Sequence, residues 1–329
     1  MLKRKSLVAL AIFATTIASA ISQSASAQDS EAVKHKLSAS NEPKLGLVLG
    51  GGGARGAAHV GVLKILEQNG VHPDYIVGTN VGAIVGGLYS AGISIQSLEE
   101  MFTQKSLMNA YLTVPLKLRL FAASAFSIPR MLGKRGYDGL YTGNKLGKFL
   151  NKYVPESEQD INDLKIPFGA VALNLLDGKT VALRHGNLGS ALQASCALPI
   201  LRKPVKLNDG LYVDGGVVNN LPVSEAKAMG ADVVIAVNLD DPDRQIAEKE
   251  FSKIGTVSHR VVTLHLKNVD KEQIKLAEIV LHPEVEQIGL MSTSSKDAVS
   301  AVQAGERAAL DSIDKIKRLL KDAGAVASP

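Results

Sequence analysis

Glycine is concentrated in three short motifs of this sequence, and each of them could position a reacting group. The first motif, Gly51-x-Gly53-x-x-Gly56, lies between an apolar segment and a helical one. Successive N–H groups at a helix start can hold the pyrophosphate of a dinucleotide or the oxyanion of an acyl-transfer reaction. A dinucleotide site also needs an acid at the end of the next strand, and that strand ends in Gly78-Thr79-Asn80. Taken alone, the glycine motif is therefore weak evidence for either kind of site.

The second motif is Gly78-Thr79-Asn80-Val81-Gly82, at the next expected junction of a strand with a helix. It has the spacing of the nucleophile elbow G-x-S-x-G, in which the two glycines make room for a sharp turn that exposes the central side chain. The helix that follows, from residue 83 to residue 90, is rich in small residues. Such a helix can pack closely against a sheet.

The third motif is an acid followed by two glycines, Asp214-Gly215-Gly216, within the segment 212–222. An isolated Asp-Gly-Gly is usually a turn. After a glycine loop and an elbow, in this order along the chain, it indicates a catalytic acid.

Together the three motifs resemble those of the patatin-like phospholipase family, in its short, bacterial, exported form without a barrel domain. Further segments share the resemblance, which covers nearly everything from Lys44 to the C-terminal helix: residues 194–199, 232–238, 279–283 and 304–307. The resemblance implies a three-layer α/β/α fold around a central, mostly parallel sheet. It also implies a Ser–Asp dyad that cleaves fatty-acyl esters of lipids, with no metal and no cofactor.

Carried over residue by residue, the resemblance assigns the dyad acid to Asp214 and the oxyanion loop to Gly51, Gly52, Gly53, Arg55 and Gly56. The glycines of the elbow are Gly78 and Gly82, and those of the acid loop are Gly215 and Gly216. The nucleophile position, however, holds Asn80 instead of serine.

Asn80 changes the expected chemistry more than the expected fold. A carboxamide nitrogen is delocalised into its carbonyl and lacks the activated lone pair that nucleophilic catalysis needs. Thr79 and Ser90 are no substitutes, because only the central side chain of an elbow points at the oxyanion site. Asn tolerates positive φ better than most residues. We therefore expect an intact fold with an impaired catalytic site.

Three accounts of Asn80 remain open at this stage. The chain is a natural pseudoenzyme that binds a lipid or a protein partner, or a single-strain or engineered variant of an active esterase, or an enzyme with slow chemistry through Asp214 and a bound water. The intact Asp-Gly-Gly and glycine motifs favour a recent or artificial loss of serine. A nucleotide-binding Rossmann-like protein is the alternative from a different functional class.

Other residues with chemical potential have simpler interpretations. We expect His59 to be a packed helix residue, since the dyad needs no imidazole, and Cys196 to be a small core residue. Arg55 is either a cation that contacts phosphate or a loop residue. Residues 101–137 combine six basic side chains with many apolar ones. This segment either contacts an anionic lipid surface or forms a cap over the core.

Composition and charge describe one large globular unit. The chain has 329 residues, 46% of them hydrophobic and 21% charged, which suits a protein with a sizeable core. Of the net charge of +5, three positive charges lie in the first 27 residues, so the remainder carries only +2. This weak balance is not the basic footprint of a nucleic-acid-binding protein.

Sequence patterns also indicate the domain organisation. Residues 1–27 have a basic start, a short apolar run and the terminal pattern Ala25-Ser26-Ala27, which predict a signal peptide and export to the periplasm or the medium. A polar linker is expected over 28–43 and the patatin-like domain over 44–228. Residues 229–329 are expected to complete the same globular unit.

Hydrophobic periodicity predicts the individual elements. Helices are expected over residues 57–68, 83–90 and 296–322. Strands are expected over 45–49, 74–77, 167–173, 180–184, 233–238, 260–265 and 278–282.

The signal-peptide pattern makes a direct prediction about the mature protein. Because Ala25-Ser26-Ala27 matches an A-x-A cleavage site, the exported form should begin near Gln28. N-terminal sequencing of the exported protein checks this. An exported form that still begins Met-Leu-Lys would contradict it.

Overall fold

The computed structural model describes residues 43–112, 137, 139, 141–199, 201–240, 246–252 and 256–327. Within it, residues 43–323 form one compact unit. The predicted signal peptide, nearly all of the predicted linker and most of the basic apolar segment 101–137 lie outside the described residues. No helix of the described part has both the length and the apolar character needed to cross a bilayer.

An eight-stranded mixed sheet forms the centre of the unit, in the order β5-β6-β3-β2-β1-β7-β8, with β4 paired to β3. The neighbours β3, β2, β1, β7 and β8 pair in parallel, whereas β4, β5 and β6 add antiparallel pairings. The strands are β1 (Leu45–Leu49), β2 (Tyr75–Thr79), β3 (Phe168–Asn174), β4 (Thr180–Leu183), β5 (Val205–Leu207), β6 (Gly210–Asp214), β7 (Val233–Val237) and β8 (Ile279–Leu281).

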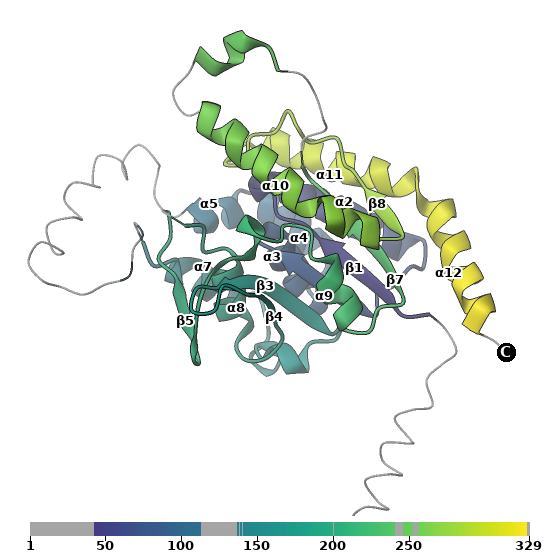
Figure 1. The fold of residues 1–329 in the computed structure, drawn as a ribbon. Coiled ribbons are helices and arrows are strands. Elements are labelled where there is room, and N and C mark those ends of the chain that lie inside the picture. The colour runs from purple at the N-terminus through teal and green to yellow at the C-terminus, as the bar shows by residue number, and fades with distance from the viewer. Residues whose placement is uncertain are drawn as a thin grey trace, which may run out of the picture. The chain divides into compact units, whose positions relative to one another are not determined.

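The helices surround this sheet (Figure 1). The α-helices are α2 (Ala57–Gln68), α3 (Val81–Ser90), α4 (Ile95–Thr103), α5 (Ser106–Leu112), α7 (Asn144–Asn151), α8 (Leu188–Ser195), α9 (Val223–Ala228), α10 (Thr256–Leu276), α11 (Ser295–Leu310) and α12 (Ile313–Ala327). Short 3-10 helices are η1 (Gly53–Gly56), η2 (Glu156–Glu158), η3 (Ile161–Asp163), η4 (Gly215–Val217) and η5 (Glu248–Ser252).

Two apolar clusters show that the sheet is buried on both faces. Alternate residues of β1, such as Leu47 and Leu49, pack with α2, α3, α4, α8 and α11. Their neighbour Val48 belongs to the opposite cluster, together with Val223 of α9 and Ile274 of α10. Figure 1 is seen from the side of α9 and α10. The predicted three-layer α/β/α fold is therefore confirmed, with five parallel strands at its centre.

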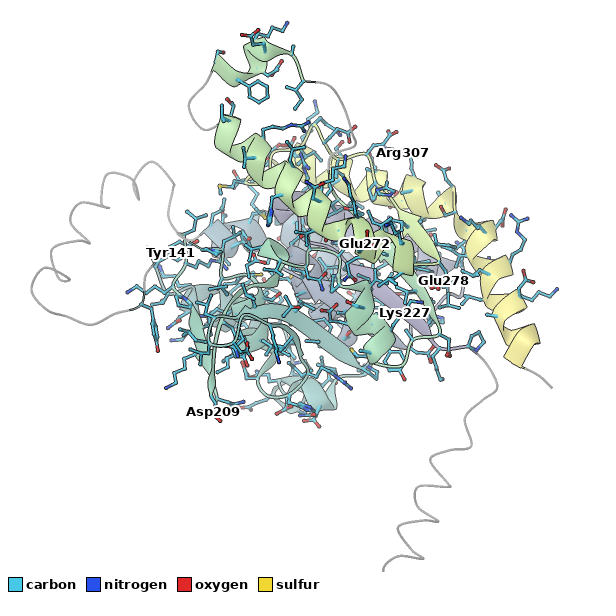
Figure 2. All side chains as sticks on the ribbon, in the orientation of Figure 1. Tyr141, Asp209, Lys227, Glu272, Glu278 and Arg307 are labelled. Carbon is cyan, nitrogen blue, oxygen red and sulfur yellow. The ribbon has the colours of Figure 1, made fainter. Side chains whose placement is uncertain are left out.

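An ion pair fastens the layer of α9 to the sheet. Lys227 Nζ on α9 lies 2.9 Å from Glu278 Oε1 just before β8, and both side chains are labelled in Figure 2. Glu278 Oε2 in turn accepts a hydrogen bond from the backbone N–H of Val234 at 2.7 Å.

Two of the expected elements are corrected by the structure. Residues 260–265 were expected to be a strand but lie inside α10. Their β-branched residues favour a strand locally, but no Gly or Pro interrupts the chain between residues 256 and 276, and the helix packs on α9. The expected helix 296–322 is two helices, α11 and α12, with a break at residues 311–312. No Gly or Pro marks that break.

Helices α2 and α11 approach one another at two glycines. A Cβ atom on Gly61 would lie 2.0 Å from the carbonyl oxygen of Val302, and one on Gly305 would lie 1.9 Å from that of Ala58. Both distances are far below van der Waals contact. The two backbones are therefore close enough that either position admits only glycine without a shift of the helices.

The close packing of α2 against α11 predicts that Gly305→Ala lowers the melting temperature. Alanine favours a helix interior by about 1 kcal/mol over glycine, but overpacking here costs about 1–3 kcal/mol or more. Differential scanning calorimetry should show a fall of several degrees, since about 2–4 °C corresponds to 1 kcal/mol in a protein of this size. Gly289→Ala is the matched control, because a Cβ there meets nothing within 4 Å. Equal melting temperatures for the two variants would contradict the close approach.

Candidate active site

The site begins at the turn between β2 and α3, where Asn80 has φ 54° and ψ −121°. This left-handed conformation is rare for residues other than glycine, and Asn is among the residues that adopt it most readily. A Cβ on Gly82 would lie 2.1 Å from the carbonyl oxygen of Leu49. The glycine is thus needed where α3 begins against β1, and the segment forms the sharp elbow that its spacing predicted.

The Asn80 side chain is enclosed by protein groups and is 5% exposed. Its Nδ2 donates a short hydrogen bond to Asp214 Oδ2 and lies 3.0 Å from the Tyr111 hydroxyl. Its Oδ1 accepts from the Val81 N–H at 2.7 Å, which caps α3. Both ends of the carboxamide therefore have partners, as a buried polar group requires.

Asp214 stands at the end of β6 and is 3% exposed. Burial raises its pKa to about 6, against the opposing effects of the Gly216 N–H, the Asn80 amide and the positive charge of Arg202. The Gly216 N–H donates to Asp214 Oδ1 at 2.9 Å. The two carboxylate oxygens thus face different partners, one on its own loop and one on the elbow.

The glycine loop between β1 and α2 differs in one respect from the expectation. The Gly51 N–H donates to Asn220 Oδ1 at 3.1 Å and lies 3.4 Å from the Asn220 carbonyl oxygen. In the described part of the chain, no partner takes the N–H groups of Gly52 and Gly53. Those two amides, rather than that of Gly51, are the donors available to a ligand.

Two further residues hold this loop in place. The His59 ring, fully buried, lies with Nε2 2.8 Å from the Gly50 carbonyl oxygen. Burial lowers its pKa to about 4, so the ring is neutral at pH 7 and donates this bond. Arg55 is also buried and donates to three carbonyl oxygens, those of Leu239, Glu286 and Ile288. His59 is thus a packed helix residue, and the Arg55 guanidinium is engaged by the surrounding loops.

A second buried guanidinium, that of Arg202, lines the same pocket as Asn80. It donates to the carbonyl oxygens of Tyr111 and Cys196 and to the Tyr141 hydroxyl at 3.2 Å. Its carbon Cζ lies 4.5 Å from the ring centroid of Tyr111 and 5.6 Å from that of Tyr141. Such stacking is favourable for a cation withdrawn from water. Arg202 thereby fixes Tyr111, which contacts Asn80.

These groups surround a pocket of about 200 Å³. Most of its wall is apolar, including Leu112, Leu198, Leu201, Val217, Leu239, Leu290 and Met291. Of the site residues expected from the sequence, the pocket is lined by Gly51, Gly52, Gly53, Arg55, Asn80, Asp214 and Gly216. Gly56, Gly78, Gly82 and Gly215 do not line it. A Cβ on Gly56 would meet the Val81 side chain, and a Cβ on each of the other three would meet backbone atoms at less than 3 Å.

Comparison with known proteins identifies the family of this chain. The family model described as patatin-like phospholipase matches residues 47–227, which is more than half of the chain. The chain belongs to the patatin-like phospholipase family.

Relatives of known sequence extend well beyond the matched part. An uncharacterized NTE family protein of Mycobacterium tuberculosis is 34% identical over 206 residues, 62% of this chain and 51% of that protein. Lysophospholipase NTE1 of Yarrowia lipolytica is 32% identical over 203 residues, 60% of this chain and 13% of that protein. The chain thus spans at most about half the length of these relatives. Among solved structures, VipD from Legionella pneumophila is similar with a TM-score of 0.47 at 15% identity, over 83% of this chain and 67% of that chain.

Among the residues that the structure describes in this patatin-like site, no other side chain takes the place of a serine. The Thr79 hydroxyl donates to the Asn219 carbonyl oxygen at 3.3 Å, and that of Ser195 donates to the Val171 carbonyl oxygen at 2.6 Å. Ser90 is buried at the far end of α3. Cys196 lines the pocket, but burial raises its pKa. Because the thiolate is the reactive form of cysteine, a buried neutral thiol is not an activated nucleophile.

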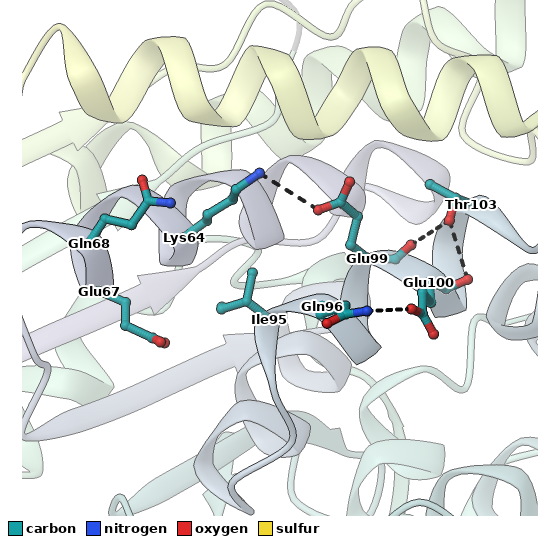
Figure 3. Close-up of a pocket in the computed structure, with 8 residues that line it drawn as sticks. All are labelled: Lys64, Glu67, Gln68, Ile95, Gln96, Glu99, Glu100 and Thr103. Atoms are coloured by element: carbon teal, nitrogen blue, oxygen red, sulfur yellow. Dashed lines mark hydrogen bonds and ion pairs between the residues drawn. The ribbon is translucent and has the colours of Figure 1, made fainter.

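A second hollow, of about 510 Å³, lies between α2 and α4 (Figure 3). Charged and amide side chains line it, and Lys64 lies 3.9 Å from Glu99 and 2.6 Å from Glu306. It contains neither a glycine loop nor any residue of the elbow. In the described residues, no group of three or more His, Cys, Asp or Glu side chains could hold a metal ion.

Five polar or charged residues of the pocket were missed by sequence reasoning: Tyr111, Tyr141, Arg202, Asn220 and Asp240. Asn220 belongs to the same segment 212–222 as Asp214, and this proximity in the sequence is the signal that could have identified it. Tyr111 and Arg202 have no local motif. Their place depends on how α5 and the loop after α8 pack around the elbow.

The raised pKa of Asp214 predicts how stability depends on pH. The folded protein binds this proton more tightly than the unfolded chain, so stability is lost as pH rises from about 4 through the folded-state pKa of about 6. Relative to Asp214→Asn, the wild type should lose about 3 kcal/mol between about pH 4 and pH 8. Urea unfolding of both proteins across this range measures the difference.

The exposed Asp209, in the turn between β5 and β6 (Figure 2), controls for removal of one negative charge. Its replacement removes a charge but no buried group, so Asp209→Asn is the baseline for the comparison. A pH-dependent difference for Asp214→Asn that does not exceed this baseline would contradict a proton held by the buried carboxyl.

Proposed function

We propose that this protein binds fatty-acyl lipids in the patatin-like site without the serine-dependent hydrolysis expected of the family. The observation that carries the proposal is the position of Asn80. It lies at the tip of the elbow, and its carboxamide donates a hydrogen bond to Asp214. The site therefore keeps the parts that recognise an acyl group and lacks the atom that would attack it.

Recognition of an acyl group is supported by the lining of the pocket. Apolar side chains from several loops suit an alkyl chain, whose burial contributes about 0.8 kcal/mol per methylene. The N–H groups of Gly52 and Gly53 provide hydrogen-bond donors for a carbonyl or carboxylate oxygen at one end. A pocket with an apolar wall and a few polar groups is typical of sites for small ligands. The relative named lysophospholipase is consistent with a lipid ligand.

The absence of turnover follows from the chemistry of position 80. In a Ser–Asp dyad the serine oxygen bonds to the ester carbonyl carbon while its proton passes to the carboxylate, and loop amides hold the resulting oxyanion. A pKa of about 6 leaves Asp214 ionised at neutral pH, ready to accept such a proton. Asn80 offers only a carboxamide N–H, which donates a hydrogen bond but forms no acyl intermediate.

A second candidate is a hydrolase that differs from an active one by Asn80 alone. The pocket, the acid and two loop amides are all in place around the elbow, which favours this alternative over a site that has decayed at many positions. We further propose export, from the signal-peptide pattern of residues 1–27, and contact of the basic apolar segment 101–137 with a lipid surface.

The proposal predicts that Asn80→Ser creates esterase activity. Serine would place a hydroxyl near Asp214, and loss of such a nucleophile elsewhere reduces the rate by about 10⁶-fold. The unmodified protein should therefore be at the detection limit on p-nitrophenyl butyrate, with the variant at least about a thousandfold above it. Release of p-nitrophenol, followed by absorbance, measures both.

Asn80→Ser combined with Asp214→Ala is the control, and it should return to the level of the unmodified protein, because the two groups act as a unit. A folded but inactive Asn80→Ser variant would rule out the second candidate and leave the binding protein. Activity of the unmodified protein that disappears in Asp214→Ala would contradict the proposal.

A further inference from the structure

Asn220, in the loop after the catalytic-acid motif, contacts the glycine loop directly. It is 5% exposed, and its Oδ1 accepts the Gly51 N–H at 3.1 Å. A Cβ on Gly51 would lie 2.4 Å from this oxygen. The two loops therefore meet without space for a side chain at Gly51, and the direction of the Gly51 amide is set by Asn220.

Asn220 is itself held by α10, whose Ile274 belongs to the same apolar cluster as the neighbouring Leu221. Asp270 of α10, which is fully buried, accepts the N–H of Asn220 at 3.0 Å and that of Leu221 at 2.9 Å through the same oxygen, Oδ1. The Asn220 Nδ2 lies 3.5 Å from Asp240 Oδ1, after β7. A buried carboxyl that accepts two backbone N–H groups holds a turn firmly. Asn220 thus has fixed partners at its backbone and at its side chain.

The neighbouring Asn219 has no part in this network. It is equally buried, but its Nδ2 donates to both carboxylate oxygens of Glu225, at 2.8 and 2.9 Å. The side chains of the two consecutive asparagines thus have different partners. That of Asn219 binds Glu225 of α9, and that of Asn220 binds the glycine loop.

We propose that Asn220 is a positioning residue for the anion-binding amides of this site, and that Asp270 holds Asn220 in place for that task. By taking the Gly51 N–H, Asn220 fixes the peptide between Gly50 and Gly51. This peptide leads directly into Gly52 and Gly53, so its orientation sets how their amides meet the carboxylate of a fatty acid. The inference rests on the proposed function, since it concerns a ligand of the same pocket.

A positioning role and a purely structural role of Asn220 can be distinguished, because they affect different ligands. Decanoate and 1-decanol carry alkyl chains of the same length, but only decanoate brings a carboxylate to the loop amides. Disordered amides weaken a charged hydrogen bond, whose loss corresponds to about tenfold or more in affinity. A general loosening of the pocket weakens both ligands alike.

The test is isothermal titration calorimetry of the full mature chain with each ligand. For Asn220→Ala we expect about tenfold weaker binding of decanoate and binding of 1-decanol within about twofold. Asn219→Ala is the matched control and should leave the ratio of the two affinities unchanged. Equal weakening of both ligands by Asn220→Ala, or no weakening of decanoate, would overturn the positioning role.

Asp270 is tested by a conservative pair of variants. Asp270→Asn keeps an oxygen that accepts the two N–H groups and should retain most of the preference for decanoate, whereas Asp270→Ala should lose it as Asn220→Ala does. If Asp270→Ala keeps the preference, α10 does not hold Asn220 for this purpose.

A measurement without ligand separates this inference from the proposed function. Amide hydrogen exchange of Gly51 should be slow in the wild type and in Asn219→Ala. It should be clearly faster in Asn220→Ala, because only this variant removes the side-chain acceptor at 3.1 Å and leaves the longer contact to the Asn220 carbonyl oxygen at 3.4 Å. If the wild type binds neither ligand, the proposed function fails and so does the role of Asn220 in anion binding, while slow exchange at Gly51 still confirms the contact between the loops. Fast exchange at Gly51 in the wild type would overturn the contact itself.

Discussion

A carboxamide at the tip of a left-handed turn donates a hydrogen bond to a buried carboxyl group, and the rest of the site is arranged around this contact between Asn80 and Asp214. Breaking the contact would leave two buried polar groups without their partner, which costs about 1–3 kcal/mol for a neutral group and more for a charged one. The Val81 N–H and the Tyr111 hydroxyl complete the surroundings of the amide. The Asn80 side chain is therefore held in its site by hydrogen bonds at both ends of its carboxamide.

The sheet order explains why such distant segments meet. Strands β2, β1 and β7 are parallel neighbours, so the elbow, the glycine loop and the Leu239–Asp240 turn leave the sheet at the same edge. Ligands of open α/β sheets bind at this edge, beyond the carboxyl ends of the strands. Strand β6 reaches the same edge through its antiparallel pairing with β3, where Asp214 lies opposite Ala172. Helix α10 contacts the loop before α9, in its own layer, through Asp270.

Sequence reasoning recovered the parts of this arrangement that depend on local chemistry. The strand at residues 45–49 and the helix at 57–68 match β1 and α2 to the residue, because their apolar patterns are bounded by glycines. The elbow was visible because its sharp turn admits only small residues on either side of position 80. Gly51 was expected to hold an oxyanion, but its N–H is taken by Asn220, 169 residues away. Contacts such as this, or the stacking of Arg202 on Tyr111, follow from packing over long separations and leave no periodic pattern. The strand expected at 260–265 failed for the same reason, since the helix α10 is supported by layers that a short window does not contain.

The central claim is that the pocket holds an acyl chain without forming a covalent intermediate. The most direct measurement is the intact mass of the unmodified protein after exposure to a long-chain alkyl fluorophosphonate, a reagent that transfers its phosphonyl group to an activated serine oxygen with loss of fluoride. Our account predicts an unchanged mass, because Asn80 has no such oxygen and the neighbouring hydroxyls donate to backbone carbonyls. A stoichiometric phosphonyl adduct on a pocket residue would show that another nucleophile is active, and would contradict the account.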